Sequence, residues 1–254
     1  MTDPRLGYQP ILEEALTLYS APRMRGQTFR QGWEAVGHLA HGWYLRCHRG
    51  ALALVVLGDA GFAEEASPLR RSIIEHVVAL QWLAVEGDRV LDTVARAHAD
   101  SSQRVRDAVV TAGWTSISLQ EADEAIASAA ADDRDPANDY LQKFATRARR
   151  YSDAHTMVEY LAECGRSHPS YESAICYYDL SDGTFVTEST RSVWQVPFAT
   201  THVLEALQAV REAFDPRPWP GELQHLIERF RDVTDVVRKA DGLAPVEWTP
   251  IPQL

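Results

Sequence analysis

The sequence contains few cysteines, and none of them is arranged in a C-x-x-C pair. Its 254 residues include only three, Cys47, Cys164 and Cys176. An odd number of widely spaced cysteines argues against both a disulfide framework and a zinc knuckle, and it is typical of a protein in a reducing compartment. We therefore expect a cytoplasmic protein, and no pattern in the sequence points to a cofactor.

Long hydrophobic runs are also lacking. The longest uninterrupted apolar run, 51–57, is far shorter than the ~20 residues that a membrane-spanning helix needs. The first ten residues, MTDPRLGYQP, do not show the basic and then apolar order of a signal peptide. A membrane partner is therefore not expected.

Positive charge is scarce. The chain has 25 Lys and Arg against 36 Asp and Glu, which gives a net charge of −11. Duplex DNA is bound largely by cationic side chains that displace counterions, so this balance argues against a duplex DNA partner. An acidic protein can still act on RNA through a local basic pocket.

Strand signals are nearly absent, whereas helical periodicity and helix-ending residues recur along the chain. We predict an all-α, single-domain bundle of about seven to nine helices over 1–244, followed by an extended proline-containing tail over 245–254. One irregular or hairpin-like segment is expected near 181–197. Several glycines in the helical stretch 27–57 are expected at close helix–helix contacts, because glycine otherwise weakens a helix.

The most informative helix runs from Ser67 to Gly87. Arg71 and Glu75 are four residues apart, so they share a helix face and can form an ion pair. If Ser67 is the N-cap, Arg70 and Arg71 lie in the first turn, where helix N–H groups and the helix dipole add to their charge and favour an anion-binding site. Two interpretations stay open: an ordinary helix-stabilising pair, or a pair that lines a pocket.

The stretch from Arg49 to His76 resembles a bacterial helical family of unknown function. The resemblance rests on a long helix, an Ala/Gly-rich turn and a helix that carries L-x-R-x-x-x-E, followed later by a Ser167-His168-Pro169 element. It covers about residues 30–180. The resemblance implies an all-α fold and a polar cluster of Arg71, Glu75 and His168, but no reaction.

A second resemblance is to HEPN ribonucleases, which are marked by an arginine followed four to six residues later by a histidine. Arg71 and His76 match this spacing, and Arg150 and His155 match it too. Chance alone accounts for about two to three matches in a chain with this many Arg and His residues. The resemblance implies that Arg71 stabilises a phosphate and that His76 is the general acid or base in metal-free RNA cleavage. It also implies a homodimer.

Two further histidine patterns could carry chemistry. Glu34, His38 and His41 share a sector of one predicted helix and could hold a metal ion, although the paired E-x-x-H pattern of carboxylate-bridged bundles is missing. His168 is expected near a helix N-terminus, where the dipole favours neutral imidazole.

Three functions follow from these patterns. The first is a HEPN-like, metal-independent ribonuclease of a toxin or phage-defence type, which uses Arg71, Glu75, His76 and His168. The second is a non-catalytic helical module that binds a small anionic ligand or a protein partner through Arg70 and Arg71. The third, ranked well behind, is a metal-dependent bundle enzyme that uses Glu34, His38, His41 and Glu75.

Overall fold

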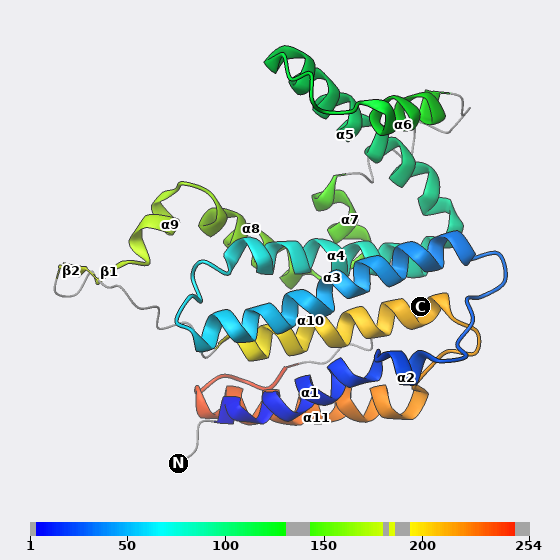
Figure 1. Ribbon diagram of the computed structural model, residues 1–254. Helices are drawn as coiled ribbons and strands as arrows, with labels where there is room; N and C mark the ends of the chain where they lie inside the picture. Colours follow the sequence, from blue (N-terminus) through cyan, green and yellow to red (C-terminus); the bar gives the residue numbers. More distant parts are fainter. Residues whose placement is uncertain (1–3, 131–142, 180–182, 186–193, 247–254) are drawn as a thin grey trace.

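The computed structural model describes residues 4–130, 143–179, 183–185 and 194–246 (Figure 1). This part of the chain is helical apart from its connections and one very short hairpin, so the prediction of an all-α bundle is confirmed. None of the described helices is both long and apolar enough to cross a membrane.

Three long helices form the centre of the bundle (Figure 1). They are α3 (Glu34–Asp59), α4 (Ser67–Glu86) and α10 (Gln195–Val210), and each packs against the other two. Helices α1 (Tyr8–Leu18) and α11 (Pro220–Ala240) cover the other side of α10. One continuous hydrophobic cluster joins these five helices, with fully buried side chains such as Leu12, Leu54, Leu80, Leu207 and Leu223.

The remaining helices extend from this centre. Helix α5 (Val90–Ala112) leaves the bundle after α4, and α6 (Gln120–Ala130) folds back along it, so that the two make a projecting arm (Figure 1). Helices α7 (Phe144–Tyr151) and α8 (Ala154–Ser167) both pack on α4. The short elements are α2 (Ala21–Met24), α9 (Tyr171–Ile175) and the 3-10 helices Pro4–Gly7, Gly87–Arg89 and Arg211–Ala213.

The expected hairpin-like segment is present but lies earlier than predicted. Strand β1 (Tyr178–Asp179) pairs with the antiparallel strand β2 (Thr184–Phe185). The end of the predicted segment is wrong, because α10 already begins at Gln195, and 186–193 lie outside the described residues. Most of the predicted tail, 247–254, also lies outside them.

The bounds of α4 agree with the sequence, but the expected N-cap does not. Helix α4 starts at Ser67 and ends before Gly87, which adopts a φ of 61°. The N-cap is Ala66, which has no capping side chain, and the Ser67 hydroxyl instead donates to the carboxylate of Glu163 over 2.6 Å. Ser67 therefore joins α4 to α8 and leaves the first turn of α4 uncapped.

A buried histidine joins α8 to α10. The ring of His202 is fully enclosed, with Nδ1 2.9 Å from Oε2 of Glu205 and Nε2 3.3 Å from Oε2 of Glu159. Burial alone would lower the pKa of His202, but the two carboxylates outweigh it and raise this pKa to about 10. His202 is therefore charged at neutral pH, and it forms ion pairs with Glu159 of α8 and with Glu205 of its own helix, α10.

Candidate functional site

The guanidinium of Arg71 lies at the centre of a polar cluster on α4. Its Nε donates to Oε1 of Glu75 over 3.1 Å, and its Nη1 lies 3.0 Å from Nε2 of His168, the residue that ends α8. The guanidinium also lies over the ring of Tyr160, 5.4 Å from its centre. The structure thus brings together Arg71, Glu75 and His168, the three residues that the sequence suggested as one polar cluster.

The contact with Arg71 indicates which nitrogen of His168 accepts a hydrogen bond. A guanidinium has only donors, so Nε2 of His168 accepts the hydrogen bond and is the unprotonated ring nitrogen. Burial is the largest single effect and lowers the pKa of Arg71, but the hydrogen bond to Glu75 and the interactions with Tyr160, Cys164 and Glu75 together outweigh it and raise this pKa. The cluster therefore pairs a permanent cation with an imidazole nitrogen that accepts a hydrogen bond from it.

Aromatic packing holds this cluster against α8. The ring of Tyr160 stacks on Phe144 of α7 with the ring centres 3.7 Å apart. Burial, followed by a hydrogen bond with Cys164, raises the pKa of Tyr160 to about 12. Tyr160 is therefore a neutral phenol at neutral pH, and its ring face is available to the cation of Arg71.

Arg70, the neighbour of Arg71 on α4, makes internal contacts. Its side chain is buried, its Nη2 lies 2.9 Å from the carboxylate of Glu163, and its Nη1 donates to the carbonyl of Ala63 over 2.7 Å. Glu163 also pairs with Arg166 over 3.0 Å. The binding of an external anion by Arg70 stays a prediction, although its charge already pairs with a carboxylate inside the protein.

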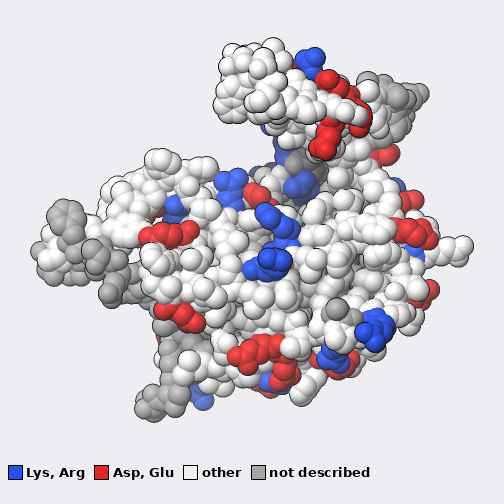
Figure 2. Space-filling view, viewed as in Figure 1, with Lys and Arg blue, Asp and Glu red and all other residues white. Residues whose placement is uncertain are grey.

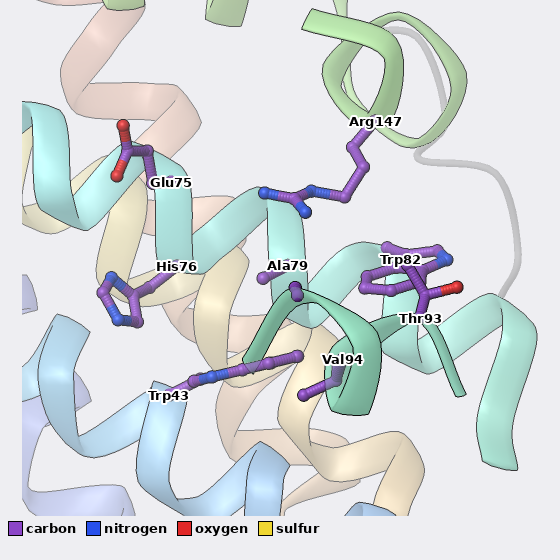
Figure 3. A pocket seen from close by; sticks show the side chains of 9 residues that line it. Trp43, Glu75, His76, Ala79, Trp82, Thr93, Val94 and Arg147 are labelled. Carbon is purple, nitrogen blue, oxygen red and sulfur yellow. The ribbon is translucent and has the colours of Figure 1, made fainter. Parts of the chain in front are cut away.

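His76 does not join the Arg71 cluster through any contact in the described part of the chain. Its Nδ1 donates to the carbonyl of Ser72 over 2.6 Å, which leaves Nε2 as the nitrogen that can gain or lose a proton. The ring instead lines a neighbouring cavity (Figure 3). The convergence of His76 with Arg71 and His168 stays a prediction.

The neighbouring cavity, here called the Trp43 cavity, has a volume of about 260 Å³. It lies between α3, α4, α5 and α7, and Glu75 is part of its wall (Figure 3). Its lining residues are Trp43, Glu75, His76, Ala79, Trp82, Thr93, Val94, Ala97 and Arg147. Because Glu75 also binds Arg71, the polar cluster and the cavity are adjacent.

Arg147 brings a second cation to Glu75. Its guanidinium lies over the indole of Trp82, 5.6 Å from the ring centre. Burial lowers the pKa of Arg147, and the charge of Glu75 partly offsets this effect. Glu75 therefore interacts electrostatically with an arginine on each side, one at the cluster and one in the cavity.

The predicted metal ligands are not brought together. The carboxylate of Glu34 accepts from the backbone N–H of Gly32 over 3.4 Å, His38 packs edge-on against Phe29, and Nδ1 of His41 lies 3.0 Å from the hydroxyl of Tyr19. Among the described residues there is no group of three or more His, Cys, Asp or Glu side chains that could hold a metal ion.

The charges are unevenly distributed over this face of the molecule. Figure 2 shows several Lys and Arg side chains over α4 and α7, and acidic side chains on the arm. Helix α7 carries Arg147, Arg149 and Arg150 within eight residues, whereas α6 carries Glu121, Asp123 and Glu124. The site thus has locally basic surroundings although the whole chain is acidic.

Several residues of the site were missed from the sequence. Arg147, Tyr160 and Glu163 lie on α7 and α8, far along the chain from α4. Tyr160, Cys164 and His168 recur every four residues, so they share one face of α8, and this spacing was the available signal. The partner of Arg70 could not be inferred in this way, because Glu163 is one of many acidic residues.

The fold and the site define an all-α bundle protein with an Arg–Glu–His cluster beside an aromatic cavity. The chain belongs to a family of unknown function (DUF5677), which matches residues 37–184. No curated protein and no solved structure matched the chain significantly. The predicted resemblance to a family of unknown function is therefore confirmed, and the resemblance to HEPN ribonucleases stays a prediction.

Proposed function

We propose that this protein cleaves RNA without a metal ion and that the Arg71 cluster is its reaction centre. The observation that carries the proposal is the 3.0 Å contact between the guanidinium of Arg71 and Nε2 of His168. A fixed cation beside a basic nitrogen is what metal-free phosphodiester cleavage needs, because one group binds the phosphate and the other accepts a proton.

In the proposed reaction Arg71 binds a non-bridging phosphate oxygen and takes the place of a metal ion. Nε2 of His168 accepts the proton of the adjacent ribose 2′-hydroxyl. The 2′-oxygen then forms a bond to phosphorus while the bond from phosphorus to the 5′-oxygen breaks. The products are a 2′,3′-cyclic phosphate and a 5′-hydroxyl, and no oxidant or other co-reactant is consumed.

The leaving 5′-oxygen needs a proton, and we assign this step to His76. Its Nδ1 is held by the carbonyl of Ser72, so Nε2 is the atom that would donate. Glu75 orients Arg71 through the hydrogen bond to Nε and acts as a positioning residue. These roles agree with those that the HEPN resemblance implies for Arg71 and His76, and they add His168 as the base.

The central test is the Arg71→Ala variant, assayed on single-stranded RNA in the presence of EDTA. We expect cleavage to fall by about 10²- to 10³-fold, the usual effect of removing one stabilising donor from a transition state. Arg104→Ala is the matched control, because Arg104 is exposed on α5. Unchanged cleavage by Arg71→Ala, or no cleavage by the wild type with EDTA, would contradict the proposal.

A second candidate is binding of an anionic ligand without turnover. The position of His76 favours it, since this ring is turned into the Trp43 cavity and bonded to Ser72. In this case a small anion such as inorganic phosphate raises the melting temperature of the wild type, Arg71→Glu loses the shift, and RNA stays intact.

The setting of this reaction is also part of the proposal. The described cysteines Cys47, Cys164 and Cys176 form no disulfide, which agrees with a cytoplasmic location. A homodimer stays expected, and the exposed apolar side chains of the arm, Val105, Val110 and Trp114, are where we would look for its contact. The molar mass in solution tests this expectation.

A further inference from the structure

We propose that the Trp43 cavity binds one unstacked nucleobase of single-stranded RNA, next to the phosphate held by Arg71. The inference rests on the proposed function, because it identifies the substrate as a single strand that is read at one base. The inference is based on three features of the cavity. Its walls include flat aromatic rings, its lining contains both a hydrogen-bond acceptor and a donor, and its residue Glu75 also binds Arg71.

The apolar part of the cavity suits a planar ring. The indole of Trp43 lies on one side of Ala79 and the guanidinium of Arg147 on the other (Figure 3). Val94 and Ala97 of α5 add to the apolar lining. Bases taken out of a strand are bound mainly by stacking on aromatic side chains and on the planes of arginine guanidinium groups.

The size of the cavity favours a ring over a larger ligand. Its volume of about 260 Å³ lies just below the range of ~300–1,000 Å³ that is typical for drug-sized molecules. One heterocycle therefore fits better than a whole nucleotide, whose sugar and phosphate would remain outside.

The polar groups of the cavity match the edge of a base. Glu75 is an acceptor, Arg147 is a donor, and the hydroxyl of Thr93 can act as either. A nucleobase carries N–H donors and carbonyl or ring-nitrogen acceptors along one edge.

The position of Glu75 places this base beside the reaction centre. One carboxylate oxygen accepts from Arg71, and the same side chain is part of the cavity wall. The Glu75 side chain is 35% exposed, so the cavity and the cluster meet at the surface. A base in the cavity would thus leave its own sugar–phosphate next to Arg71 and His168.

The test measures binding of a short single strand whose 2′-hydroxyls are replaced by fluorine, because this strand cannot be cleaved. A set of strands, each lacking one base, is compared with the intact strand. We expect one position at which loss of the base weakens binding by about 5- to 150-fold, the range measured for single stacking contacts. Trp43→Ala should weaken binding of the intact strand by the same factor as loss of that base. In this variant the strand that lacks the base should bind no more weakly than the intact strand.

Two further variants keep the test independent of folding defects. Ala79→Leu fills the cavity but retains the indole, and it should act like Trp43→Ala. Phe62→Ala is the matched control, since Phe62 is 53% exposed and lies in the connection between α3 and α4, outside the cavity lining. Each variant is checked by circular dichroism and thermal melting.

The outcomes separate the inference from the proposed function. If folded Trp43→Ala and Ala79→Leu bind every strand like the wild type, or if the wild type binds no strand, the nucleobase site is refuted even where RNA is cleaved. In the other case, Trp43→Ala removes the effect of the missing base on binding, but the protein does not cleave ordinary RNA in the presence of EDTA. The nucleobase site then stands and the proposed ribonuclease activity is refuted.

Discussion

At the scale of single residues, two neighbouring arginines on α4 have opposite environments. Arg70 is turned into the protein and pairs with Glu163, with the two side chains only 6% and 8% exposed. Arg71 lies about 100° further around the helix and reaches Glu75 and His168, with 30% of its side chain exposed. One arginine stabilises the junction of α4 with α8, and the other is accessible to a substrate.

This difference predicts unequal losses of stability. Arg70→Met leaves a buried carboxylate whose remaining cationic partner among the described residues is Arg166, so we expect the free energy of unfolding to fall by about 3 kcal/mol. Arg71→Met is the matched control and should cost less than about 1 kcal/mol, because exposed ion pairs contribute little. Urea unfolding measures the free energy of unfolding of both variants. Equal losses of stability would contradict the different environments of Arg70 and Arg71.

At the scale of elements, a glycine lets α3 approach α4 closely. A Cβ atom at Gly50 would lie 2.8 Å from Cγ1 of Ile73, which is closer than packed carbon atoms allow. Gly42 on the same helix has nothing within 4 Å of such an atom in the described structure. The expectation of close helix contacts at glycines therefore holds for Gly50 and fails for Gly42.

The two glycines predict substitutions of opposite sign. Gly50→Ala should destabilise the protein by about 1–3 kcal/mol, because the methyl group forces Ile73 to move. Gly42→Ala should stabilise it by up to about 1 kcal/mol, since alanine restricts the unfolded chain and adds no clash. Thermal or urea unfolding measures the stability of both variants. If both substitutions change the free energy of unfolding in the same direction, the close contact of Gly50 with Ile73 is contradicted.

The ion pairs of His202 predict a pH-dependent link between α8 and α10. The pKa of His202 is raised from 6.5 in the unfolded chain to about 10 in the fold. The folded state thus binds one more proton between these values, so the stabilisation is complete below pH 6.5 and is lost as the pH rises through 10. Over pH 7–9 this slope reaches about 1.4 kcal/mol per pH unit.

The measurement compares the free energy of unfolding across that range in the wild type and in His202→Gln. The variant should show a shallower fall, because it lacks the titrating ring. His155→Gln is the control, since His155 is exposed on α8 and should follow the wild type. Parallel curves for the wild type and His202→Gln would exclude the proposed link.

At the scale of the whole molecule, the region that matches the family model does not contain all the helices that build the hydrophobic core. Residues 37–184 contain α4 and nearly all of α3 but lack α1, α10 and α11, which contribute Leu12, Leu207 and Leu223 to the same hydrophobic cluster. We expect a fragment of residues 37–184 to lack a cooperative thermal transition, because the faces of α3 and α4 that pack on α10 would be exposed. A sharp transition of the isolated fragment would show that it folds alone.

The sequence predicted best what is local and periodic. The bounds of α4, the Arg71–Glu75 pair and the all-α class follow from spacings of three and four residues and from Gly87 at the helix end. Even the approach of His168 was anticipated, through the family resemblance. Long-range choices were not predictable, because the burial of Arg70 depends on where α8 packs.

The exact position of the hairpin and the presence of the cavity could also not be predicted from local periodicity. Two-residue strands carry almost no periodicity, so the start of the hairpin at Tyr178 was missed. The cavity could not be predicted, because nothing in the sequence shows that Arg147 of α7 would meet Trp43 and Trp82.

The arm has a mechanical consequence for the site. Helix α5 supplies Thr93 and Val94 to one wall of the Trp43 cavity, and α7, the first described helix after the arm, supplies Arg147 to another. Helix α6 of the arm has no buried side chain among its described residues, and the outer half of α5 buries Ser102 and Val109. Helix α5 thus belongs both to the arm and to a wall of the cavity. If a molecule bound to the arm displaced Thr93 and Val94, it would change the affinity of the cavity for its ligand, and that ligand would change the affinity of the arm for the molecule by the same factor.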